Sequence, residues 1–215
     1  QQIDGLASST VKVIKTTSAN VGYLWLNQNP EVSNGVTDDK DFMTAVRKGI
    51  DYSELLKIAG AGSSHPGGIV PSQFVGSIKP DADTEFNLDD AKAALAKSGY
   101  SGQEVKLSYP TDATLDGIQF ATLAQKLQAH LEAVGVKVTL DGMPIATLLD
   151  AYRAGKLQAG LMYWGPDFPD PSDYTTFSPG LGLGLRAGWA AEMDPDVTAA
   201  RHAAEQATGA DRAAA

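Results

Sequence analysis

The residues of this chain best suited to contact a ligand lie in one stretch, where aromatic side chains are followed by prolines and carboxylates. Tyr163 and Trp164 end an apolar segment, Gly165 and Pro166 break it, and Asp167 follows at once. An abrupt passage from a buried strand to a rigid acidic loop is typical of side chains held at the mouth of a cleft. A core strand followed by a polar turn gives the same local pattern, so both interpretations stay open at this point.

Two carboxylates of this stretch, Asp167 and Asp170, admit two kinds of chemistry. As an acid and a base they would serve a freestanding hydrolase, but an offset of three residues on a proline-rich turn places carboxylates side by side. We favour Asp167 as the acceptor for a cationic ligand group, with Asp170 capping the following turn through Ser172. A charge-assisted hydrogen bond contributes about 1.5–3 kcal/mol, and a neighbouring indole adds about 0.5–2 kcal/mol by cation–π contact.

Motifs of other known mechanisms are missing from the sequence. It has no cysteine, which excludes disulfides, thiolate metal sites and cysteine nucleophiles. It has no Walker loop or Gly-x-Ser-x-Gly elbow, and the glycines at 180–184 have the wrong spacing for a dinucleotide loop. His65 lies in a long loop, whereas His130 and His202 lie in expected helices, where we predict solvated positions. We therefore expect no catalytic residue, no cofactor and no metal.

Composition narrows the class of protein further. With 215 residues, 43% of them hydrophobic, and a net charge of −9, the chain is typical of a globular domain with a proper core. No cluster of Lys and Arg exists to bind nucleic acid, and no apolar run approaches the roughly 18 residues of a membrane span. An alanine-rich helix expected from Asp194 to Ala215 has no stop signal, so we expect the chain to be a fragment of a longer protein.

The elements expected to position the acidic loop follow from hydrophobic spacing. Strands or extended segments are predicted at Thr10–Thr16, Gly22–Asn27, Glu104–Tyr109, Val136–Leu140 and Leu157–Trp164. Helices are predicted at about 42–50, 51–59, 87–98, 118–134, 144–155 and 194–215, with 60–86 irregular.

Strand, long helix and strand over residues 104–140 predict a βαβ crossover, which places two parallel strands in one sheet with the helix on one face. The helix at 144–155 and the strand at 157–164 repeat the pattern. We therefore predict a single α/β domain. Open α/β sheets bind ligands outside the carboxyl ends of their strands, which is where Trp164 and Asp167 would lie.

Five segments, in this order, resemble the C-terminal lobe of extracellular solute-binding proteins of the peptide/oligopeptide (dipeptide, nickel) class, bacterial solute-binding protein family 5. They are Phe42–Asp51, Asp89–Tyr100, Leu127–Val138, the acidic stretch at 163–174, and Ala203–Arg212. The resemblance implies a single lobe of a periplasmic-binding-protein-like type II clamshell, with a mixed, mainly parallel sheet flanked by helices. Residues 1–215 would form that one α/β lobe, and residues 1–18 would include the connector to the other lobe.

The resemblance also implies a function. Such a protein is the substrate-binding component of an ABC importer, and it captures a peptide or similar small solute between two lobes for delivery to the membrane permease. It lies at the extracellular face of the membrane, in the periplasm or anchored to the cell surface as a lipoprotein. Its partners are the solute, the N-terminal lobe missing here and the permease subunits, without nucleic acid. The alternatives are the hydrolase and a ligand-sensing lobe of a regulator.

The resemblance assigns the ligand site residue by residue. Trp164 lines the pocket and Asp167 pairs with the α-amino group of a peptide, while Tyr163 and Gly165 flank them. Dipeptide binders also carry an arginine for the ligand carboxylate after the strand at 104–109, and residues 110–117 contain none. Longer-peptide binders can have an arginine three residues before the tryptophan, where this chain has a leucine. The resemblance therefore leaves dipeptide, oligopeptide, sugar or another cationic solute open.

Overall fold

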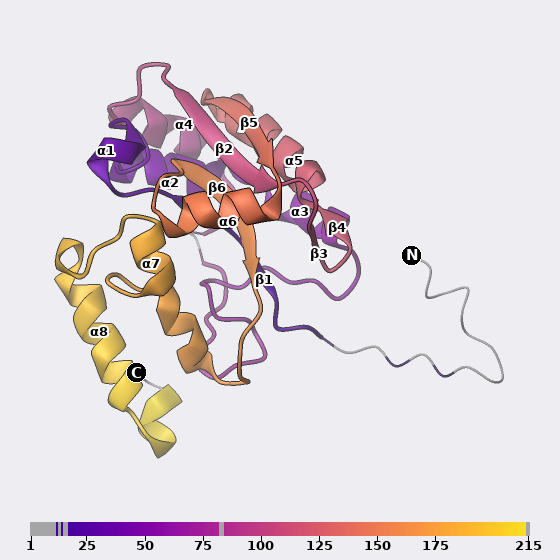
Figure 1. Ribbon diagram of the computed structural model, residues 1–215, viewed down its shortest axis with the longest axis vertical. Coiled ribbons are helices and arrows are strands. Elements are labelled where there is room, and N and C mark those ends of the chain that lie inside the picture. The colour runs from indigo at the N-terminus through magenta and orange to yellow at the C-terminus, as the bar shows by residue number, and fades with distance from the viewer. Residues whose placement is uncertain (1–11, 13, 15–16, 82–83, 214–215) are drawn as a thin grey trace.

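A four-stranded sheet forms the centre of the computed structural model, which describes residues 12, 14, 17–81 and 84–213 (Figure 1). In spatial order its strands are β1 (Val21–Leu26), β6 (Ala159–Trp164), β2 (Glu104–Pro110) and β5 (Lys137–Met143). Strands β6, β2 and β5 run parallel, and β1 pairs antiparallel with β6. The predicted α/β class with a mixed, mainly parallel sheet is confirmed. The strand predicted at 10–16 and the connector at 1–18 fall largely outside the described residues.

The predicted βαβ crossover is present. Strand β2 pairs with β5 in continuous parallel register, from Glu104 opposite Lys137 to Pro110 opposite Met143, and α5 (Phe120–Val134) connects them. The start of the helix was predicted too early, because residues 114–119 form a small hairpin of β3 (Thr114–Leu115) and β4 (Ile118–Gln119). Its turn places Asp116 and Gly117 at positive φ.

Helices cover both faces of the sheet. Figure 1 shows α2 (Lys40–Gly49), α4 (Leu88–Lys97) and α5 behind it, and α6 (Ile145–Arg153) in front. The shorter α1 (Pro30–Ser33) and α3 (Tyr52–Ala59) complete this part of the chain. Asp39 and Asn87 cap α2 and α4 through their side chains. Between Ala59 and Leu88 the described residues form neither helix nor strand, which confirms the irregular segment predicted there.

Two apolar clusters result, because successive side chains of a strand point to opposite faces of the sheet. Leu161 of β6 packs with Phe120 and Leu127 in the cluster behind the sheet. Its neighbour Met162 packs with Trp25 and Tyr152 in the cluster in front. Strand β6 is central, so both of its faces are buried and its sequence reads as a continuous apolar run.

The C-terminal part of the chain consists of short helices beside the sheet, coloured orange to yellow in Figure 1. They are η2 (Pro171–Phe177), α7 (Gly182–Arg186), η3 (Ala191–Met193), α8 (Pro195–Gln206) and η4 (Gly209–Ala213). The prediction of one helix from 194 to 215 was wrong: α8 ends at Gln206 because Ala207 is extended, with φ −66° and ψ 138°. In the described part of the chain, no helix combines the length and apolarity that crossing a membrane requires.

Candidate functional site

The carboxyl ends of the parallel strands lie at one edge of the sheet, and several loops meet there. Strands β2, β5 and β6 end at Pro110, Met143 and Trp164. The loops after β2 and β5 are tied together, since Asp112 Oδ1 accepts a 2.7 Å hydrogen bond from the backbone N–H of Ile145. We call this region the carboxyl edge. It is the place where the sequence predicted a ligand site.

Asp173 organises the acidic loop that follows β6. Its Oδ2 accepts a 3.1 Å hydrogen bond from the indole N–H of Trp164 and a 2.9 Å bond from the backbone N–H of Asp167. The ring of Trp164 also meets Phe177 edge-on, with centroids 6.2 Å apart. One carboxylate therefore fixes both the orientation of the indole and the position of the residue that precedes Phe168.

Asp167 itself is exposed, and only its backbone N–H is engaged. Within the part of the chain that the structure describes, its carboxylate forms no hydrogen bond or ion pair. The two residues expected to contact ligand, Trp164 and Asp167, are thus brought together by Asp173. The geometry leaves one of them with an unsatisfied acceptor facing solvent.

Asp170 has a structural role, as the sequence predicted. Its Oδ1 accepts hydrogen bonds from the backbone N–H of Ser172 at 2.9 Å and from the Ser172 hydroxyl at 2.7 Å, and it also pairs with Arg212. These bonds, with those from Ser172 the largest cause, lower the pKa of the Asp170 carboxyl. A carboxylate held ionised by three donors is unsuited to serve as a general acid, so the pair with Asp167 offers no acid–base arrangement.

Tyr163 lies on the opposite face of the sheet from Trp164. Its ring stacks on Phe120 of α5, with centroids 6.3 Å apart, and it packs against the cluster behind the sheet. Tyr163 is near the carboxyl edge only because it is the second-last residue of β6. The structure therefore separates these two neighbours, which the sequence had grouped together.

Gly165 allows the chain entering β1 to approach the acidic loop closely. A Cβ atom at this position would lie 2.6 Å from Oδ1 of Asn20. Asn20 in turn donates a 2.9 Å hydrogen bond to Asp116 of the β3–β4 hairpin. The segment before β1 is also held by Tyr174, whose hydroxyl donates to the carbonyl of Ala19 at 2.7 Å. Glycine at 165 thus has a steric role.

The irregular segment between α3 and α4 contributes to the same edge. Gln73 donates a 3.0 Å hydrogen bond to the carbonyl of Ser18, and the ring of Phe74 lies 5.7 Å from that of Tyr174. Val75 and Ile78, beyond this anchor, are 48% and 60% exposed. The carboxyl edge therefore combines an open carboxylate, an indole and the anchoring residues Gln73 and Phe74 of this segment.

Two of the histidines, His65 and His130, contact residues outside the acidic loop. His65 stacks on Tyr52, with ring centroids 3.7 Å apart. His130 was predicted to be solvated, and this was wrong: its side chain is only 10% exposed, and it contacts Glu54 at 3.2 Å and the backbone N–H of Asp51 at 3.3 Å. It ties α5 to α3. Among the described residues, no group of three or more His, Asp or Glu side chains is placed to hold a metal ion.

Asp173 is the residue of this edge that sequence reasoning missed. A signal for it existed, because a partly buried indole N–H needs an acceptor, and Asp173 is the nearest carboxylate after the turn that Asp170 caps. Sequence spacing alone, however, did not show which of the three acids folds back onto Trp164.

Comparison with known proteins supplies the family. The sequence model of a family described as "Bacterial extracellular solute-binding proteins, family 5 Middle" matches residues 2–180. Among curated proteins, the chain is 26% identical over 144 residues to Di/tripeptide-binding protein 2 of Pseudomonas aeruginosa, covering 66% of this chain and 27% of that protein. It is 26% identical over 166 residues to the Probable D,D-dipeptide-binding periplasmic protein DdpA of Escherichia coli, covering 75% and 30%.

A solved structure shows the same fold. The dipeptide-binding protein of Pseudoalteromonas sp. SM9913, in complex with Met-Leu, superposes with a TM-score of 0.78 at 20% identity, covering 99% of this chain and 42% of that one. The neighbours of this kind are type II periplasmic binding proteins. The chain spans less than a third of the curated relatives it matches and about two fifths of the solved structure.

Proposed function

Because this chain belongs to the bacterial extracellular solute-binding proteins of family 5, we propose that it is one lobe of a two-lobed receptor for an ABC importer. The lobe closes over a peptide or a similar small solute against a second, N-terminal lobe, and the closed complex delivers the solute to permease subunits in the membrane. The protein works at the extracellular face of the membrane, and it does no chemistry on the solute. Residues 1–215 form this lobe, with the connector to the other lobe within 1–18.

The observation that carries the proposal is the unpaired carboxylate of Asp167 beside the indole of Trp164. Asp173 accepts hydrogen bonds from the Trp164 indole and from the Asp167 backbone, so both residues are ordered before a ligand binds. Binding therefore costs little conformational entropy in this loop. The site lies on an open edge and not in a closed cavity, which suits a cleft whose other wall is a separate lobe. Gly165 lets the segment before β1 approach, and Tyr163 supports the end of the strand from the other face.

The chemistry of this edge favours a ligand with a cationic amine. An ammonium group donating to Asp167 contributes about 1.5–3 kcal/mol as a charge-assisted hydrogen bond. Peptides have such a group at their N-terminus, and the curated relatives are named for binding dipeptides or tripeptides. The loop at 110–117 offers Asp112 and no arginine, so we infer that this lobe recognises the amino end of the solute, and that its carboxylate end is bound elsewhere.

Calorimetric titration of the two-lobed protein with a free-amine peptide and with its N-acetylated form tests the assignment. Asp167→Asn keeps the size of the side chain and removes the charge, and we expect it to weaken binding of the free-amine peptide by roughly ten- to a hundredfold. The acetylated peptide has no ammonium group, so its affinity should not depend on the substitution.

Glu132→Gln is the matched control. Glu132 is exposed near the C-terminal end of α5, so this substitution removes the same charge as Asp167→Asn but far from the carboxyl edge. It should bind both peptides like the unmodified protein. Equal losses for Asp167→Asn and Glu132→Gln, or a loss that is the same for both peptides, would contradict the assignment of Asp167 to the amine.

A further inference from the structure

One cavity of the structure lies at the other end of strand β6 from Trp164. It has a volume of about 470 Å³, and its lining comes from the chain after β1, the end of α6 and helix α7. The lining residues are Asn29, Arg153, Ala154, Gly155, Gly182, Leu185, Arg186 and Gly188. With β6 running between them, the cavity and the carboxyl edge are separated by about 17 Å of strand. The proposed peptide site does not include it.

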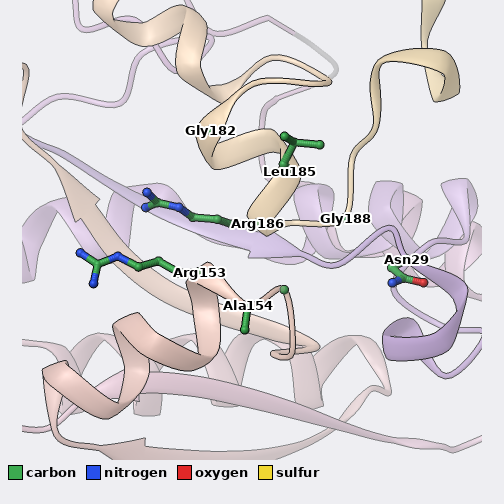
Figure 2. A pocket seen from close by; sticks show the side chains of 8 residues that line it. Asn29, Arg153, Ala154, Gly182, Leu185, Arg186 and Gly188 are labelled. Atoms are coloured by element: carbon green, nitrogen blue, oxygen red, sulfur yellow. The ribbon is translucent and has the colours of Figure 1, made fainter.

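Two arginines lie in this cavity, and none of the residues lining it is acidic. Figure 2 shows the side chains of Arg153, from α6, and Arg186, from α7, extending in the same direction. The guanidinium of Arg186 lies 5.6 Å from the ring centroid of Tyr152, the residue next to Arg153, which fixes it in place. In the described part of the chain, Arg186 forms no ion pair with a carboxylate.

Arg153 has only a weak partner. Its Nη1 lies 4.0 Å from Oδ1 of Asp150, one turn earlier in α6, and the two side chains are 58% and 85% exposed. An exposed pair at this distance contributes little and is screened by salt. Two guanidinium groups at one cavity repel each other, so placing them together is favourable when an anion lies between them. The chain has a net charge of −9, yet neither guanidinium group at this cavity has a close carboxylate partner among the described residues.

Backbone packing builds the rest of the cavity. Gly188 has φ +69°, and a Cβ there would lie 2.4 Å from Oδ1 of Asn27 and 2.5 Å from the backbone nitrogen of Asn29. The carbonyl of Ala187 accepts a 2.7 Å hydrogen bond from the backbone N–H of Gln28, which joins the loop after α7 to the chain that follows β1. The side chain of Asn29 uses its Oδ1 to cap α1, which leaves its Nδ2 as a further donor.

We propose that this cavity is a binding site for a small oxyanion, a molecule bearing a phosphate or carboxylate group held by Arg153 and Arg186. A guanidinium presents parallel N–H donors that match two oxygens of such a group. The volume suits a ligand larger than a single ion. Asn29 also lines the cavity, on the side away from the two guanidinium groups in Figure 2.

Titration of the 215-residue chain with sodium phosphate and with sodium succinate tests the proposal, with sodium chloride holding the ionic strength constant. We expect saturable binding to one site for at least one of the two anions, observed by calorimetry and as a rise in the melting temperature. The tighter ligand identifies which acidic group the cavity prefers. Arg153→Ala should weaken that binding by roughly tenfold or more.

Lys92→Ala is the matched control, since it removes one positive charge from an exposed position on α4, and it should leave the affinity unchanged. Arg186→Lys keeps a cation over Tyr152 but loses the paired donors, so it should weaken binding without unfolding the chain. The proposal is overturned if neither anion binds beyond the effect of chloride, or if Arg153→Ala binds the anion as tightly as Lys92→Ala. These variants leave the carboxyl edge intact, so their outcome is independent of the peptide experiment.

Discussion

The two ends of strand β6 differ in charge and in the way they are built. At its carboxyl end the exposed group is the carboxylate of Asp167, positioned by a second carboxylate, that of Asp173. At its amino end two guanidinium groups, those of the exposed Arg153 and the half-buried Arg186, lie at a cavity. A single strand therefore separates a site suited to an amine from a site suited to an acid. The two proposed sites would therefore take ligands of opposite charge at opposite ends of the same strand.

The means of construction differ as well. Side chains fix the carboxyl edge, through bonds from Asp173 and Asp170 to backbone N–H groups. Buried contacts fix the amino end: Nδ2 of the fully buried Asn27 donates to the carbonyls of Gly155 and Leu157 at 3.1 and 2.9 Å, and Gly188 packs against Asn27 without room for a side chain. We therefore expect substitution of the exposed Asp167 to act mainly on binding, and substitution of the buried Asn27 or of Gly188 to act mainly on folding.

The largest contrast should appear when the 215-residue chain is compared with the two-lobed protein. We expect the chain alone to bind a free-amine peptide at least roughly a hundredfold more weakly, equal to about 2.7 kcal/mol, because half of the peptide's contacts are missing. Its affinity for phosphate or succinate should match that of the two-lobed protein, since one lobe supplies the whole cavity. Calorimetry on both proteins measures this, and tight peptide binding by the chain alone would contradict the two-lobe account.

Gly188→Ala should damage the amino end by lowering the free energy of unfolding by about 2–4 kcal/mol, because it combines a left-handed backbone with a clash against Asn27 and Asn29. Gly35→Ala is the control: its φ is +66°, but no atom lies within 4 Å of the added Cβ, so only the backbone cost of about 1–2 kcal/mol applies. Urea denaturation compares the two, and equal losses would show that the close approach at Gly188 is unimportant.

Asp173→Ala should act on both folding and binding, because it removes the acceptor of the Trp164 indole and of the Asp167 backbone. We expect a loss of about 1–3 kcal/mol in the free energy of unfolding, together with weaker peptide binding. Asp167→Ala should weaken peptide binding with almost no change in the unfolding free energy, since that carboxylate is exposed and unpaired in the described part of the chain. If the two variants were equally stable, Asp173 would not be the organiser of the loop.

The smallest effect should come from the contact between α3 and α5, which belongs to neither edge. Hydrogen bonds from Lys126 and His130 lower the pKa of Glu54 to about 2. A carboxyl of the unfolded chain titrates near pH 4.3, so this stabilisation is complete above about that pH and is lost as the pH falls toward 2. Glu54→Gln should flatten the decline in melting temperature over this range and leave binding at pH 7 unchanged. An unaltered decline would mean that the contact contributes nothing.

The fold was predictable where the signal is local. The βαβ unit follows from alternation in β2 and β5 and from helical spacing in α5. The pairing of β1 with β6, more than a hundred residues apart, leaves no local pattern. The early end of α8 had a signal that was overlooked: Gly209, three residues after Gln206, has positive φ, and glycine commonly ends helices.

The position of the candidate residues in the fold was predictable, but the contacts among them were not. The rule that open sheets bind ligands at the carboxyl ends of their strands located Trp164 and Asp167 correctly on that edge. Alternation along β6 already implied that Tyr163 points away from Trp164, and this was overlooked. The role of Asp173 depends on how the turn at Asp170 folds back, which sequence spacing does not specify.

The central claim is that the amine of the solute binds beside Trp164, and the indole N–H signal of Trp164 in a 15N-labelled two-lobed protein tests it most directly. Trp164→Phe assigns the signal. We predict that a free-amine peptide shifts this signal at saturation, because its ammonium group binds Asp167 beside the carboxylate that accepts the indole hydrogen bond. Phosphate, bound at the other end of β6, should leave it unmoved. A peptide that saturates the protein without shifting the Trp164 signal would contradict the account.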